Sequence, residues 1–120
     1  MALFSKSVQA AANISDGIRI CIMRKPDFNA TWDIWMPTLA PSLDLLHAYQ
    51  ANLVDWPGYI RRFTEEVIVG KADHLKLLVD MAKHNKITVL CWEQMPEFCH
   101  RRLIVEQTKI IDLSLEVGIF

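Results

Sequence analysis

Short apolar runs alternate with segments of helical periodicity along the chain. Residues 18–23 form an apolar run that follows Asp16-Gly17, a pattern typical of a strand after a turn. Residues 87–91 form a second run, which is β-rich and uncharged and therefore predicts a strand buried on both faces. We also expect a short strand at residues 3–8.

Three segments between these runs predict helices. Pro41 suits the first turn of one helix, and Asp55 suits the N-cap of a second helix that ends at Gly70. The third helix precedes the run at residues 87–91. The apolar stripes of the three helices are Leu43, Leu46, Tyr49 and Leu53; Trp56, Ile60, Phe63 and Val67; and Leu75, Leu78, Val79 and Ala82.

The remaining segments complete an α/β pattern. Prolines and two tryptophans fill residues 24–41, which predicts a long loop. A fourth helix is expected at residues 97–109 and a last strand at residues 110–115. Alternating strands and helices predict one small three-layer α/β domain over residues 1–120, with a partly parallel sheet flanked by helices. In such sheets ligands bind beyond the carboxyl ends of the strands.

Composition and charge narrow the function classes. The 120 residues are 52% hydrophobic and 22% charged with a formal net charge of −1, which fits a globular protein and disfavours nonspecific binding to nucleic acid. Without an apolar run of about 18 residues or a secretory signal, we expect no membrane partner. Three cysteines do not make a disulfide framework, so we expect a reduced, cytoplasmic setting.

The segment from Cys91 to Arg101 carries the candidate chemistry. Cys91 ends a predicted strand, and Cys99 and His100 fall in the first turn of the predicted fourth helix. The positive end of that helix, with Arg101 beside it, favours anions and thiolates. Cys99 or Cys91 is thus the candidate nucleophile, and His100 or Glu93 the candidate acid or base.

Three further residues are candidates for binding an anionic substrate. Arg24 directly follows the first predicted strand, Arg101 lies at the helix start, and Trp35 lies in the long loop. The sequence lacks a glycine-rich phosphate loop, a Gly-x-Ser-x-Gly elbow and a Cys-x-x-Cys pair. We therefore expect no cofactor.

The order of these segments resembles the domain of unknown function 488 family. Leu90-Cys-Trp-Glu followed by Cys99-His-Arg-Arg is similar to that family's signature. Ile20-Cys-Ile-Met-Arg-Lys-Pro with the tryptophan segment after it, and the aromatic stretch from Trp56 to Phe63, are also similar. The likeness covers about residues 16–106. It implies an α/β fold and a shared pocket, and no settled reaction.

Each candidate residue also has a purely structural interpretation. Cys91 and Cys99 could be small buried core residues, and His100 could cap the helix. Glu93 could pair with an arginine, and Arg24, Arg101 and Trp35 could be surface or packing residues. A zinc site of Cys91, Cys99 and His100 is disfavoured, because neighbouring residues point in different directions from a helix.

Three hypotheses for function follow. The first is a small enzyme or ligand-binding protein for an anionic small molecule. The second is a non-catalytic module that binds a protein or nucleic acid, although net charge disfavours nucleic acid. The third is a structural subunit that forms a homodimer through its apolar tail, which ends at Phe120.

Overall fold

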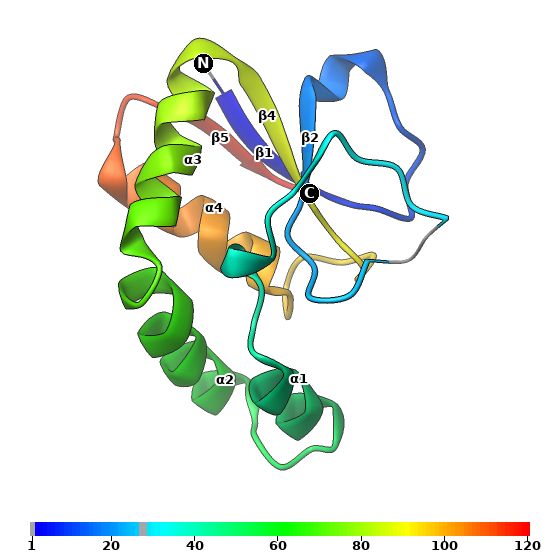
Figure 1. Ribbon diagram of the computed structural model, residues 1–120, viewed down its shortest axis with the longest axis vertical. Helices are drawn as coiled ribbons and strands as arrows, with labels where there is room; N and C mark the ends of the chain where they lie inside the picture. The colour runs from blue at the N-terminus through cyan, green and yellow to red at the C-terminus, as the bar shows by residue number, and fades with distance from the viewer. Residues whose placement is uncertain (1, 27–28) are drawn as a thin grey trace.

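The computed structural model describes residues 2–26 and 29–120, and within them the strands form a five-stranded sheet in the order β3-β2-β4-β1-β5 (Figure 1). Each paired strand is parallel to its neighbour. The α/β class is therefore confirmed, and the sheet of the described residues is parallel throughout rather than in part. The strands are β1 (Ala2–Ser7), β2 (Ile18–Cys21), β3 (Ile34–Trp35), β4 (Lys86–Cys91) and β5 (Glu116–Ile119).

Strand β4 occupies the centre of the sheet because its residues tolerate burial on both faces. Five of its six residues, from Ile87 to Cys91, are buried. It pairs with β1 on one side, where Leu3 is opposite Ile87, and with β2 on the other, where Ile20 is opposite Val89. The prediction of a doubly buried strand is confirmed.

Four α-helices in the described ranges follow the predicted order: α1 (Leu43–Gln50), α2 (Trp56–Phe63), α3 (Ala72–His84) and α4 (His100–Ile111). The Ser42 hydroxyl caps α1 by accepting from the Leu45 N–H, and the Asp55 carboxylate caps α2 by accepting from the Gly58 N–H. Helix α2 runs on into a π-helical segment, Thr64–Val69 (η3). Leu53 lies beyond α1 and is exposed, so it does not belong to the predicted stripe.

Helices α3 and α4 pack against one face of the sheet, whereas α1 and α2 pack against each other and lie below the sheet in the view of Figure 1. Leu3, Ile20 and Ile87 contribute the apolar side chains of this face, and they form one core with Phe63 and Leu78 from the helices. Alternate residues of the strands point to the opposite face. That face carries polar side chains and is covered by a thin layer that includes a 3-10 helix, Ile14–Asp16 (η1).

Several boundaries differ from the prediction, among them the end of β2 at Cys21 rather than at residue 23. The loop at residues 24–41 contains β3 and a 3-10 helix, Pro37–Leu39 (η2). Helix α4 begins at His100 rather than at residue 97, because the Cys99 N–H closes a turn onto the Pro96 carbonyl. The last strand is β5 rather than residues 110–115: Ile110 and Ile111 belong to the exposed last turn of α4, so their β-branched character did not mark a buried strand.

Within residues 2–26 and 29–120, none of the helices combines the length and the apolar character that a transmembrane helix needs.

Candidate functional site

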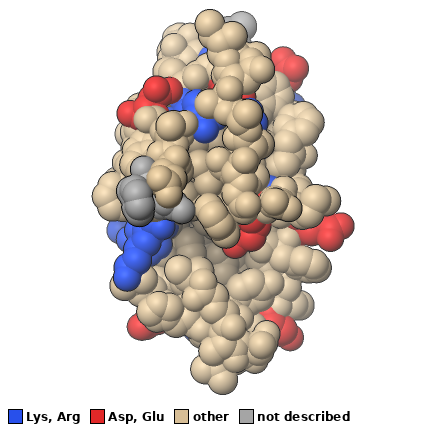
Figure 2. Space-filling view, turned by 90° about the vertical axis from the view of Figure 1, so that its right-hand side faces the viewer, with Lys and Arg blue, Asp and Glu red and all other residues tan. Residues whose placement is uncertain are grey.

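The carboxyl ends of the strands open into a cavity of about 340 Å³. Because the strands are parallel, Cys91 at the end of β4 lies beside the chain that leaves β2 through Met23 and Arg24. Helix α1 closes the other side of the cavity with Leu43 and Leu46. Figure 2 shows a hollow with basic residues on one side of its rim and acidic residues on the other. The cavity therefore lies at the carboxyl edge of the sheet, where the sequence led us to expect a ligand site.

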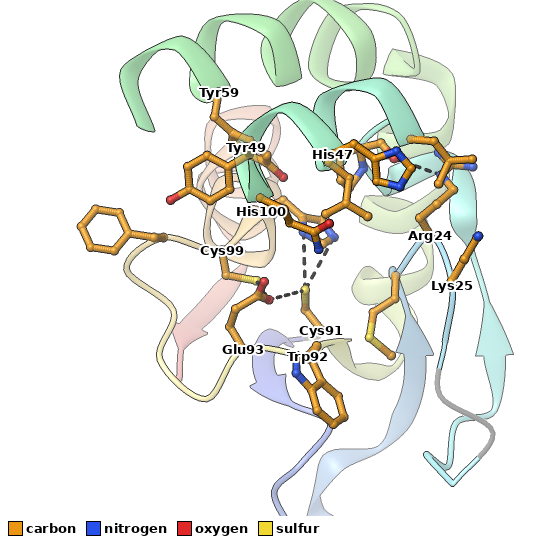
Figure 3. Close-up of a pocket in the computed structure, with 16 residues that line it drawn as sticks. Arg24, Lys25, His47, Tyr49, Tyr59, Cys91, Trp92, Glu93, Cys99 and His100 are labelled. Atoms are coloured by element: carbon orange, nitrogen blue, oxygen red, sulfur yellow. Dashed lines mark hydrogen bonds between the residues drawn. The ribbon is translucent and has the colours of Figure 1, made fainter. Parts of the chain in front are cut away.

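Four chemically active side chains converge on the floor of this cavity (Figure 3). The Sγ atoms of Cys91 and Cys99 each lie 3.2 Å from Oε2 of Glu93. The Cys91 Sγ also lies 3.4 Å from Nδ1 of His100. We call Cys91, Glu93, Cys99 and His100 the thiol cluster.

A backbone carbonyl fixes how His100 faces the two thiols. Nε2 of His100 lies 2.7 Å from the carbonyl oxygen of Ile22, close enough to donate its proton there. Nδ1 is then the nitrogen left to exchange a proton with the sulfur atoms. Burial alone would lower the pKa of His100, but contact with Cys99 and with the Ile22 carbonyl raises it. The protonated form of the ring is therefore favoured.

Cys99 immediately precedes α4 instead of lying in its first turn. Its extended backbone, with φ −126° and ψ 139°, makes it the N-cap residue. Burial alone would raise the pKa of Cys99, but interactions with Cys91, with charged His100 and with the backbone N–H of Arg101 lower it to about 3. Cys99 is therefore deprotonated at neutral pH, and the dipole of α4 also favours its negative charge.

The other two acids of the thiol cluster respond in the opposite way. Burial, followed by the neighbouring Cys99 thiolate, raises the pKa of Cys91 well above the ordinary thiol value. Burial and the same thiolate raise the pKa of Glu93. Glu93 as a whole is exposed, yet its Oε2 points inward to both sulfur atoms. The Cys99 thiolate thus lies next to a Cys91 thiol and a Glu93 carboxyl that tend to stay protonated.

Basic and aromatic residues form the walls of the cavity. Arg24 lines it and donates from Nε and one Nη to the carbonyls of Pro41 and Ala40, which fixes its guanidinium at the rim. Lys25 lines the cavity next to it. Several lining residues had not been singled out as site residues from the sequence: Lys25, His47, Tyr49, Tyr59 and Phe98. His47, Tyr49 and Tyr59 line the cavity because the fold brings α1 and α2 over the strand ends, whereas Lys25 and Phe98 lie in the loops after β2 and before α4.

Two of the predicted binding residues do not line the cavity. Arg101 is fully buried and donates to the carbonyls of Glu93, Gln94 and Phe120, so it holds the loop that carries Glu93. Trp35 donates from its indole nitrogen to the Met23 carbonyl and supports the segment before Arg24. Arg101 and Trp35 therefore hold backbone segments of the site in place without lining the cavity.

The donor set of the thiol cluster also has the composition of a zinc site. The sulfur atoms of Cys91 and Cys99 and a ring nitrogen of His100 all lie within 4.8 Å of one another. The prediction against zinc assumed that the side chains of Cys99 and His100 point in different directions from one helix. This assumption was wrong, because Cys99 is the N-cap residue before the helix and its sulfur lies close to the ring of His100.

Comparison with known proteins identifies the family. A family model described as "Active DUF488-N3 subclade" matches residues 3–109, which is most of the chain and includes the whole thiol cluster. Neither the curated proteins nor the solved structures contain a match. The chain therefore belongs to the domain of unknown function 488 family.

Proposed function

We propose that the protein is a small enzyme in which the Cys99 thiolate attacks an anionic small molecule bound in the cavity. The observation that carries this proposal is the convergence of a thiolate, an imidazole and a carboxyl on the floor of one open cavity. A nucleophile, a base and a group that orients them within hydrogen-bonding reach are the elements of nucleophilic catalysis.

The basic rim supports an anionic substrate. Arg24 and Lys25 line the same cavity as Cys99, and Figure 3 draws them across the opening from Tyr49. Among the described residues, the hydrogen bonds of Arg24 to two carbonyls use two of its five N–H groups, so others can donate to a ligand. A negatively charged group at the rim would place the rest of a small molecule over the two sulfur atoms.

The proton transfers of such a reaction follow from the geometry. The Cys99 sulfur forms a bond to an electrophilic carbon of the substrate, and the bond to the leaving group breaks. The leaving group takes the proton from Nδ1 of His100. Neutral His100 then removes a proton from a water molecule, whose oxygen attacks the same carbon and releases the Cys99 thiolate. Glu93 and Cys91 hold protons beside the sulfur and limit the charge that accumulates there.

The test compares two alkylating reagents that differ in charge. Iodoacetate is an anion and iodoacetamide is neutral, and both transfer a carbon of similar size to a thiolate. We expect Cys99 of the folded protein to favour iodoacetate over iodoacetamide by about tenfold more than the same cysteine does in the unfolded chain, which corresponds to ~1.4 kcal/mol of attraction. Arg24→Gln and Lys25→Gln should each reduce that preference.

Lys86→Gln is the matched control, because Lys86 is a lysine outside this cavity. It should leave the preference unchanged. Equal selectivity of the folded and unfolded protein would contradict an anion site, and modification of Cys91 rather than Cys99 would contradict the choice of nucleophile.

A non-catalytic interaction module is the second candidate. Large apolar side chains on the loop beside the cavity are half-exposed or more, which is the usual character of a binding surface: Trp92, Met95 and Phe98. A binding module does not require a reactive thiol. Slow alkylation of all three cysteines in the folded protein would therefore favour this candidate over the enzyme.

A further inference from the structure

We propose that Cys91 and Cys99 form a reversible disulfide when the protein meets a hydroperoxide, so that the floor of the cavity is also an oxidation site. The two sulfur atoms lie within 4.8 Å of each other and approach the same carboxylate oxygen. Both cysteines are free thiols in the structure.

The local backbone permits the sulfur atoms to close on each other. A disulfide requires them to approach to about 2 Å. Residues 92–98, between the two cysteines, form turns and bends rather than helix or strand. Cys99 has extended rather than helical backbone dihedrals, so the steric limits on rotamers within a helix do not apply to it.

Glu93 now lies between the two sulfur atoms and has room to leave. Its side chain belongs to an exposed residue at the cavity, so the carboxyl can turn away while Arg101 keeps the Glu93 carbonyl in place. The movement needed is therefore confined to side chains and to the short segment before α4.

The chemistry balances with a hydroperoxide as the oxidant. The Cys99 thiolate attacks the terminal oxygen, so that a sulfur–oxygen bond forms and the oxygen–oxygen bond breaks. The alkoxide, or hydroxide, that leaves takes a proton from His100, and Cys99 becomes a sulfenic acid. Cys91 sulfur then attacks Cys99 sulfur, and the departing hydroxide takes the Cys91 proton to form water. Two thiols lose two electrons, and the peroxide gains them.

The position of each thiol assigns its role in this sequence. Cys99 has the N-cap position of α4, where the helix N-terminus favours a thiolate, so it is the sulfur that meets the oxidant first. Cys91 ends β4 with its sulfur within reach of Cys99, as a resolving cysteine should be. If the proposed enzymatic function holds, the disulfide removes its nucleophile and switches the enzyme off until a thiol reductant restores it.

The experiment measures the bond itself in the reduced full-length chain, without any substrate. Hydrogen peroxide is added in small excess, and the products are mapped by mass spectrometry. Trypsin leaves both cysteines on one peptide, because residues 92–98 contain no lysine or arginine. Cleavage after glutamate separates them at Glu93 and Glu97. We expect the separated fragments to remain linked by a bond that dithiothreitol breaks.

Single variants assign the two roles. Cys91→Ser should stop at a sulfenic acid on Cys99, which dimedone traps. Cys99→Ser should slow oxidation of Cys91 by at least tenfold. Cys21→Ala is the matched control, since Cys21 is buried in the same apolar cluster without being one of the three converging donors, and it should oxidise as the wild type does.

Several outcomes would overturn the proposal. They are a bond that includes Cys21, bonds between chains only, and over-oxidation of wild-type Cys99 to the sulfinic acid without a bond to Cys91. The wild-type map decides even if a variant fails to fold. A disulfide without the preference for iodoacetate would leave the oxidation site standing and remove only the anion-specific enzyme.

Discussion

Two polar clusters, one on a face of the sheet and one at its carboxyl edge, combine acidic and basic groups in different proportions. On the face opposite the helices, the Asp16 carboxylate accepts hydrogen bonds from Lys6 and Arg19, so one negative group meets two positive ones. At the carboxyl edge, the thiol cluster assembles three acidic groups, Cys91, Glu93 and Cys99, around one base, His100.

The pKa values follow from this difference. Burial raises the pKa of Asp16, but hydrogen bonds from the Asn13 N–H, Lys6 and Arg19 lower it by more, so its net pKa is lowered and the carboxylate stabilises the fold. In the thiol cluster the acids push one another's pKa values apart, low for Cys99 and high for Cys91 and Glu93. Complementary charges indicate a structural role, whereas opposed pKa values at a cavity indicate chemistry.

The largest loss of stability is expected for a substitution in the apolar core next to the thiol cluster. Phe63 is fully buried, and its ring centre lies 5.7 Å from that of His100. Phe63→Ala should lower the free energy of unfolding by about 3–5 kcal/mol, the usual cost of truncating a buried phenylalanine. Denaturant unfolding measures it. Leu53→Ala, at an exposed position, is the control and should change stability by less than ~0.5 kcal/mol. A loss below ~1 kcal/mol for Phe63→Ala would mean that this core does not support the site.

Removal of Asp16 should have the next largest effect. Asp16→Asn leaves Lys6 and Arg19 without their carboxylate and should cost about 3 kcal/mol, at the lower end for a buried ion pair because the Lys6 side chain remains 21% exposed. Since the folded pKa lies below the unfolded value of about 3.9, this stability is complete above that value and is lost as the pH falls through the folded pKa. Unfolding curves of both proteins between pH 2 and pH 6 should therefore converge only at acidic pH. Convergence at neutral pH would contradict the structural role.

Substitution within the thiol cluster should cost little stability. Cys99→Ser removes a thiolate whose lowered pKa stabilises the folded state at neutral pH, but it also relieves Cys91 and Glu93, whose pKa values that thiolate raises. These effects oppose each other, so we expect the free energy of unfolding at pH 7 to change by less than ~1 kcal/mol. The same variant should lose reactivity toward iodoacetate. If it unfolds as readily as Phe63→Ala does, then Cys99 belongs to the core and the contrast between the two clusters fails.

The last prediction concerns the zinc content of the purified protein, which we expect to be near zero. The described residues bring two thiols and one imidazole together, one donor short of the four Cys or His ligands that structural zinc sites usually have. We therefore still expect elemental analysis of the purified protein to find no stoichiometric zinc. About one zinc per chain would reassign Cys91, Cys99 and His100 from thiol chemistry to metal binding.

The sequence predicted the location of the site better than the orientation of its parts. Cys91, Glu93 and Arg24 follow directly from strand ends, and parallel strands bring such ends together. Arg101 shows the limit of this reasoning, since a helix-start arginine can face a ligand or turn inward. The backbone carbonyls of the loop at Glu93 and Gln94 decide its position, and their geometry is not encoded in any local pattern.

The N-cap position of Cys99 was beyond prediction for a related reason. Helix boundaries depend on single turns, and here the hydrogen bond from the Cys99 N–H to Pro96 delays the helix by three residues relative to the predicted start at residue 97. That small shift turns Cys99 toward His100. His47, Tyr49 and Tyr59 line the cavity only because α1 and α2 pack over the strand ends, which no local pattern predicts.

The pH dependence of Cys99 alkylation tests the central claim most directly. Cys99 is only 1% exposed but lines the cavity, so a small neutral reagent such as iodoacetamide is suitable. The rate of labelling at Cys99 should be nearly constant from pH 5 to pH 8, because the pKa of this thiol is lowered to about 3. The unfolded chain, whose thiols titrate near pH 8.5, should instead react about tenfold faster with each pH unit in that range. A folded protein whose Cys99 follows the unfolded profile, or reacts only after denaturation, would contradict a stabilised thiolate in an open site.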